Sequence, residues 1–106
     1  MRQFRLSQEA EADLDAIWLH IAQAASNIDI ATRVIENLTA RFWLLAQYPF
    51  IGRSRPDLRT DLRSFPAEDY IIIYRTVPDD VVLILHVLHA AFRREFMRFM
   101  RAAKPT

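Results

Sequence analysis

The middle of the chain gathers arginines in one short segment. The segment holds Arg53, Arg55, Arg59 and Arg63. Guanidinium groups can bind RNA phosphates or stabilise the charge that develops on a phosphate during cleavage, and they can equally form bidentate pairs with the carboxylates of a protein partner. Gly52 and Pro56 keep the segment from becoming helical, so several of these side chains can converge on one patch. The pattern predicts a surface for an anion or an acidic partner, with internal pairing to Asp57, Asp61 or Glu68 as the structural alternative.

Further arginines lie in two later segments. Arg75 ends the run YIIIYR, and Arg93 and Arg94 begin a basic C-terminal stretch whose phenylalanines recur at helical spacing. A basic amphipathic helix can lie on a membrane, but one this short is a weak anchor, so docking onto its own sheet or onto a partner helix is favoured. The candidate binding residues are therefore Arg53, Arg55, Arg59, Arg63, Arg75, Arg93 and Arg94.

Histidine supplies the candidate for proton transfer. His86 and His89 are three positions apart on an expected strand, so they point to opposite faces and cannot bind one metal together. His89 is expected at the strand end, beside the arginine-bearing segments, and is the better candidate of the two for a functional role. The sequence contains no phosphate-binding glycine loop and no serine motif, and we expect neither a metal nor another cofactor.

Charge and composition narrow the class of protein. The formal net charge is +1, but acidic residues outnumber arginines before Gly52 and basic residues are in excess after it. The absence of cysteine excludes a disulfide scaffold, a thiolate metal site and a cysteine nucleophile. No stretch approaches the ~18 apolar residues of a membrane span, and the N-terminus lacks the apolar run of a signal peptide. We expect a single domain over residues 1–106, located in the cytoplasm and not associated with a membrane.

Hydrophobic spacing predicts two helices in the first half of the chain. Ser7 can cap a first helix from about Ser7 to Ala24, and Ser26 or Asn27 can cap a second helix that ends before Pro49. The apolar residues of both recur at helical spacing, so each helix presents one stripe to a common core. The two helices should form an antiparallel hairpin.

Strands are predicted at the start of the chain and throughout its second half. The expected strands are Arg2 to Leu6, Leu62 to Phe65, Tyr70 to Thr76 and Val81 to His89. The consecutive isoleucines at 71–73 indicate a strand covered on both faces. The order β-α-α-β-β-β with a short C-terminal helix predicts an α+β fold, an antiparallel sheet packed against the helical hairpin. Trp18, Leu38 and Ile72 should then share one core.

The order of these motifs resembles the ParE/RelE superfamily of small toxins from bacterial toxin–antitoxin pairs, and its ParE-like branch in particular. The matching stretches are FRLSQEAEADLDAIWLHIA at Phe4 to Ala22, YPFIGRSRPDLRTDLRSFP at Tyr48 to Pro66, YIIIYR at Tyr70 to Arg75, and VLILHVLHAAFRR at Val82 to Arg94. Together they cover most of the chain.

The resemblance implies the toxin half of a type II toxin–antitoxin pair, in a hetero-oligomeric complex with a ParD-like antitoxin whose partly disordered region folds on contact. ParE-like members poison DNA gyrase, RelE-like members cut messenger RNA on the ribosome, and a non-toxic relative could be retained for antitoxin binding or plasmid stabilisation. His89 resembles the position of the general acid or base in RelE-type ribonucleases. Arginines replace the lysines of many ribosome-dependent members, however, and Ala90, Ala91 and Phe92 stand where a tyrosine would follow the last strand. These departures favour a gyrase inhibitor or a non-toxic relative over a ribonuclease, and of these the gyrase inhibitor is the preferred interpretation.

Overall fold

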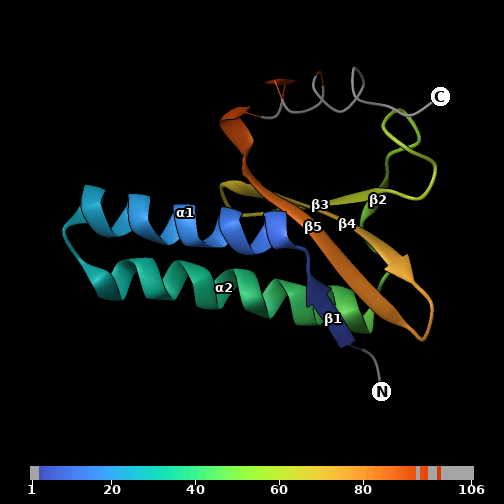
Figure 1. Cartoon of the computed structure of the whole chain (residues 1–106), viewed down its shortest axis with the longest axis horizontal. Helices are drawn as coiled ribbons and strands as arrows, with labels where there is room; N and C mark the ends of the chain where they lie inside the picture. The colour runs from blue at the N-terminus through green and yellow to red at the C-terminus, as the bar shows by residue number, and fades with distance from the viewer. Residues whose placement is uncertain (1–2, 93, 96–97, 99–106) are drawn as a thin grey trace.

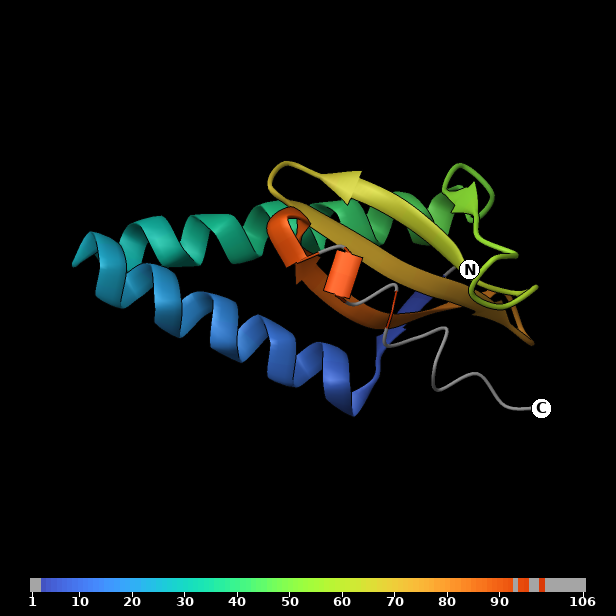
Figure 2. The same ribbon diagram turned by 90° about the horizontal axis from the view of Figure 1, so that it is seen from above.

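A helical hairpin packs against one face of a five-stranded sheet in the computed structural model, which describes residues 3–92, 94–95 and 98 (Figure 1). The helices are α1 (Gln8–Ala25) and α2 (Ile28–Gln47), and the strands are β1 (Gln3–Leu6), β2 (Arg53–Ser54), β3 (Arg63–Ala67), β4 (Tyr70–Val77) and β5 (Val81–His89). A short 3-10 helix, Ala90–Phe92, follows β5. In both ribbon views the turn between α1 and α2 projects past the sheet (Figures 1 and 2). No helix in the part of the chain that the structure describes is long and apolar enough to cross a membrane.

Capping residues set the ends of both helices where the sequence predicts them. The Ser7 hydroxyl accepts a hydrogen bond from the Ala10 N–H at 3.0 Å, and the Asn27 carboxamide oxygen accepts one from the Asp29 N–H at 2.9 Å. Ser26 ends α1 in the left-handed conformation, with φ 52°. These local contacts explain why the hairpin could be predicted from residue types alone.

The sheet has the order β1-β5-β4-β3-β2 and is mixed. Strands β2 to β5 are antiparallel to their neighbours, as predicted, whereas β1 runs parallel to β5, with Gln3 opposite Val81 and Leu6 opposite Ile84. The prediction of a wholly antiparallel sheet was therefore wrong at this edge. A tight hairpin forces antiparallel pairing, but β1 and β5 lie at opposite ends of the described chain, so no local pattern fixes their relative direction. The two-residue strand β2 was predicted as loop.

The α+β fold has a hydrophobic core on each face of the sheet. On the helical face, Leu38 and Phe42 of α2 pack with Ile72 of β4. On the other face, Ile73 packs with two leucines of the loop between β2 and β3. Ile72 and Ile73 are both fully buried, which confirms the predicted strand with two covered faces.

Trp18 of α1 and the C-terminal segment differ from what the sequence predicts or cannot be compared with it. Trp18 was expected in the core with Leu38 and Ile72, but it is only half-buried at the α1–α2 contact, where its Nε1–H donates to the Thr32 hydroxyl at 3.3 Å. That prediction was wrong because Leu14 and Ile17, on the same stripe of α1, face the core in its place. The predicted C-terminal helix and Arg93 fall largely outside the described residues.

Candidate binding surface

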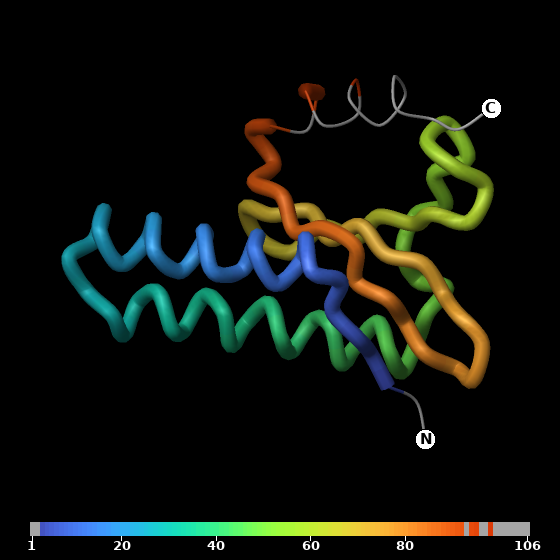
Figure 3. The backbone as a smooth tube through the Cα atoms, viewed as in Figure 1, coloured from blue at the N-terminus to red at the C-terminus, as the bar shows by residue number. Residues whose placement is uncertain are grey.

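The arginine segment is a packed loop on the face of the sheet away from the helices. Leu58 and Leu62 are fully buried against Ile73, and the Arg55 N–H donates to the Leu62 carbonyl at 2.8 Å. The loop leaves the end of α2 and lies at the end of the molecule away from the α1–α2 turn (Figure 3). Because its leucines are buried, the backbone of the loop is anchored to the sheet, and this sets where its arginines emerge.

Arg55 is the most buried arginine among the residues that the structure describes. It is 9% exposed, and its Nε and Nη2 groups donate to the two carboxylate oxygens of Asp57 at 3.1 and 2.9 Å. The hydrogen bond to Asp57 raises the pKa of Arg55, against the opposing effect of burial. The internal ion pair that the sequence offered as an alternative is therefore formed here. Arg55 serves first to hold the loop closed.

Three other arginines lie at the loop surface. Arg59 Nε lies 3.5 Å from one oxygen of Asp61, and Arg75 Nη1 of β4 lies 4.0 Å from the other. Arg53 is exposed, stands opposite Ser64 in the β2–β3 pair, and has no ion pair among the residues that the structure describes. It lines a depression of about 200 Å³ together with Arg55, Ser64, Pro66 and Ile71. One shared carboxylate cannot neutralise two arginines, so this side of the sheet keeps a positive excess.

Arg63 secures the turn between α2 and β2. Its Nη1 donates to the carbonyl of Gly52 at 2.8 Å and to that of Phe50 at 3.4 Å, and its guanidinium carbon lies 5.1 Å from the centre of the Phe50 ring. Of the predicted loop arginines, Arg53 and Arg59 thus offer the most accessible charge, whereas Arg55 and Arg63 organise the loop.

Tyr74 holds the same turn from the core, which sequence reasoning missed. Its hydroxyl donates to the Pro49 carbonyl at 2.9 Å and accepts the Gly52 N–H at 2.9 Å. A Cβ added to Gly52 would lie 2.2 Å from that hydroxyl oxygen, so a glycine is required by the close approach of the tyrosine and not by its backbone conformation. The signal in the sequence was that Gly52 is the only glycine of the chain.

The two histidines of β5 contact different groups. His86 Nδ1 lies 3.4 Å from a carboxylate oxygen of Asp13, the same oxygen that accepts the Val87 N–H. His89 is exposed, its ring packs edge-on against Tyr70 at 5.5 Å, and its Nδ1 accepts the Ala91 N–H at 3.0 Å.

His89 does not lie beside the arginine loop. It stands opposite Tyr70 at the start of β4, whereas Arg63 stands opposite Tyr74, four residues further along the strand. The expectation that His89 lies beside the arginine loop was wrong, because the antiparallel register places the end of β5 at the start of β4, away from Tyr74, which pairs with Arg63. Arg94 is exposed, and no group of side chains in the described part of the chain could hold a metal ion.

Solved structures share this architecture. A chain of the chromosomal ParDE toxin–antitoxin system from P. aeruginosa superposes with a TM-score of 0.70 at 23% identity, and the match covers 84% of this chain and 96% of that one. A chain of the toxin–antitoxin complex RelBE2 from Mycobacterium tuberculosis superposes with a TM-score of 0.56 at 22% identity, and the match covers 83% of this chain and 96% of that one. The fold is therefore the α+β fold found in these toxin–antitoxin complexes.

Sequence comparison defines the family. The family described as "ParE toxin of type II toxin-antitoxin system, parDE" matches residues 4–93, and the chain belongs to this family. Toxin ParE1 of Caulobacter vibrioides is 30% identical over 87 residues, which are 81% of this chain and 90% of that protein. Toxin ParE3 of the same organism is 27% identical over 78 residues, which are 74% and 77% of the two chains. The ParE-like resemblance predicted from the motifs is confirmed.

Proposed function

We propose that this toxin arrests growth by binding DNA gyrase, and that a cognate ParD-like antitoxin neutralises it in a hetero-oligomeric complex. Such a toxin would act in the cytoplasm, without a cofactor and without an enzymatic reaction of its own. The observation that carries the proposal is the separation of His89, which pairs with Tyr70, from Arg63 of the arginine loop, which pairs with Tyr74 four residues further along β4.

A ribonuclease needs a group to take the 2′-hydroxyl proton and cations close to the same phosphate. His89 has its Nδ1 engaged by the Ala91 N–H, and its ring contacts Tyr70 and Phe92. Asp69 and Glu68 contribute to the raised pKa of Tyr70, after desolvation by burial, so negative charge lies at this end of the sheet. His89 thus lies apart from Arg53 and Arg59, the accessible cations of the loop, which supports a binding role over catalysis.

The arginine surface suits the antitoxin. An acidic segment that folds onto the arginine surface, Arg53, Arg59 and Arg75, would form charge-assisted hydrogen bonds with guanidinium groups that the loop and β4 present on the same side of the sheet. Coupled folding of this kind buries ~1,000–3,000 Å² and gives a negative heat-capacity change. Calorimetry with the product of the adjacent gene should show this change, and a null titration with correctly folded toxin would contradict antitoxin binding.

The gyrase assignment is tested by expressing the chain without antitoxin, mapping cellular RNA and measuring supercoiling by purified gyrase. We expect inhibited supercoiling and intact messenger RNA, with His89→Ala as toxic as the wild type and Arg53→Glu less toxic. His20→Ala, an exposed change on α1, is the matched control for the histidine substitution. Codon-phased cleavage with unimpaired supercoiling would show a ribosome-dependent ribonuclease, and an absent growth defect would show a non-toxic relative.

A further inference from the structure

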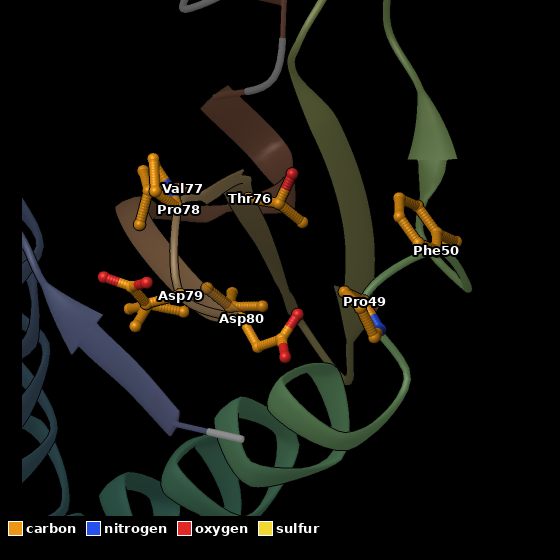
Figure 4. Close-up of a pocket in the computed structure, with 9 residues that line it drawn as sticks. Pro49, Phe50, Thr76, Val77, Pro78, Asp79 and Asp80 are labelled. Atoms are coloured by element: carbon orange, nitrogen blue, oxygen red, sulfur yellow. The ribbon is translucent and has the colours of Figure 1, made fainter. Parts of the chain in front are cut away.

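A pocket of about 250 Å³ lies between the loop after α2 and the β4–β5 turn (Figure 4). Most of its lining is apolar. The lining residues are Pro49, Phe50, Thr76, Val77, Pro78, Asp79, Asp80, Val81 and Val82. Neither the arginine surface nor the histidines contribute to it, so the proposed function leaves this pocket without a role.

One wall of the pocket is held in place by the core. Tyr74 fixes Pro49 through its carbonyl, and Arg63 fixes Phe50 through both its carbonyl and its ring. Phe50 nevertheless stays 70% exposed. Since the backbone at Pro49 is fixed by Tyr74 and the Arg63 guanidinium lies against the Phe50 ring, this wall of the pocket is organised before any partner arrives, which lowers the entropic cost of binding. Exposed aromatic residues held in this way are typical of the central contacts of protein interfaces.

The opposite wall carries negative charge. Asp79 and Asp80 form the tip of the turn, both with positive φ, at 70° and 58°. The Asp80 carboxylate points toward Pro49, whereas the Asp79 carboxylate points the other way (Figure 4). Neither aspartate has an ion pair with a residue that the structure describes, so no described side chain neutralises the Asp80 charge at the pocket.

We propose that this pocket binds an arginine or lysine side chain presented by a partner protein. The aliphatic stem would lie on Phe50 and Val77 while the cationic head reaches Asp80, because long basic side chains bury their methylene stems and keep the charge near a polar group. An acidic segment or a nucleic acid phosphate would meet the Asp80 carboxylate and be repelled. The chain would then have two docking surfaces of opposite charge, the arginine surface for an acidic partner and this pocket for a basic one.

The probe is N-acetyl-arginine methylamide, titrated into the full chain while the methyl signals of Val77, Val81 and Val82 are followed by NMR. A ligand of this size in a preformed site should bind with a dissociation constant in the millimolar range, roughly 1–10 mM. The citrulline analogue has the same shape without the charge, and it should bind at least about twofold more weakly. The corresponding glutamate derivative should leave the three valines unmoved.

Two substitutions test the role of the carboxylate. Asp80→Asn should weaken arginine binding by about two- to fivefold, as expected for one exposed ion pair, while Asp79→Asn removes the same charge from the same turn and should leave the affinity unchanged. Asparagine tolerates the left-handed conformation, so both variants should keep the turn.

The proposal would be overturned by valine signals that do not respond to the arginine derivative, by a citrulline analogue that binds as tightly as the arginine derivative, or by equal losses of affinity in Asp80→Asn and Asp79→Asn. Tighter binding of the glutamate derivative would identify an acidic partner and overturn it as well. Since the assay does not use gyrase, failure of the gyrase assignment would leave this result unaffected.

Discussion

Removing the Tyr74 hydroxyl tests how the arginine loop is held. Tyr74 is fully buried, and its hydroxyl bridges Pro49 and Gly52, which lie 25 and 22 positions earlier in the chain. Tyr74→Phe keeps the ring and its packing but leaves the Gly52 N–H and the Pro49 carbonyl without this partner. The substitution therefore measures the two hydrogen bonds with little contribution from a cavity.

The expected cost follows from the burial of the two backbone groups. Gly52 is buried, so its unpaired N–H costs about 1–3 kcal/mol, whereas the partly buried Pro49 carbonyl can be approached by water and loses about 0.5–1.5 kcal/mol. The free energy of unfolding should fall by about 2–4 kcal/mol. For a domain of this size the fall corresponds to a decrease in Tm of roughly 10–20 °C.

Urea denaturation of Tyr74→Phe and of Tyr70→Phe supplies the measurement and its control. Tyr70 lies on the same strand and faces the same core, but its hydroxyl has no hydrogen bond to a described residue, so its loss should cost under about 0.5 kcal/mol. Equal losses in the two variants would refute the bridging role of Tyr74. A second check is Gly52→Ala, whose added Cβ would lie 2.2 Å from the Tyr74 hydroxyl oxygen and 2.6 Å from a ring carbon. It should destabilise both backgrounds, and the wild type more, because only there does it also disrupt the hydrogen bonds of the hydroxyl.

Further predictions concern the two cores and the response to alkaline pH. Leu38→Ala on the helical face and Leu58→Ala under the arginine loop should each lower the free energy of unfolding by about 2–5 kcal/mol, and a loss below 1 kcal/mol at Leu58 would mean that the loop is not anchored. Arg59→Ala should change stability by less than about 0.5 kcal/mol in the same melts, because its ion pair is exposed. Burial raises the pKa of Tyr74 and of Tyr70, so stability should be complete below pH 10 and fall as the pH rises beyond it. In urea melts from pH 8 to 11, the free energy of unfolding should fall less in Tyr74→Phe than in the wild type. An equal fall in both would exclude Tyr74 as a source of the alkaline destabilisation.

The sequence was most informative where structure depends on near neighbours. The caps at Ser7 and Asn27 satisfy N–H groups two or three residues away, and both helices begin within one residue of the predicted position. The direction of β1 was not predictable in this way, because β1 pairs with β5, which lies far away along the chain: Gln3 stands opposite Val81. The same limit applies to Trp18, since helical spacing defines a stripe but not how far along the helix the core extends.

In the candidate site, too, the sequence predicted contacts between near neighbours but not contacts that depend on strand register. Residue types alone predicted a basic loop and the possibility of internal pairing, and Arg55 pairs with Asp57 two positions away. The Tyr74–Gly52 contact joins residues 22 positions apart, and only the register of β3 on β4 brings them together. Register also separates His89 from the loop, which no spacing within β5 could indicate.

The loop arginines have different structural roles, and these roles determine which substitutions can report on function. Reversing Arg55 to Glu would place a second carboxylate beside Asp57 in a nearly buried position, and reversing Arg63 would release the carbonyls of the turn. Loss of toxicity in either variant would therefore follow from a damaged loop as readily as from a lost contact with a partner. Arg53 is exposed and unpaired among the described residues, so its reversal changes the charge of the surface and leaves the loop intact. A defect in Arg53→Glu with an unchanged melting curve is accordingly the result that would locate partner binding on this face of the sheet.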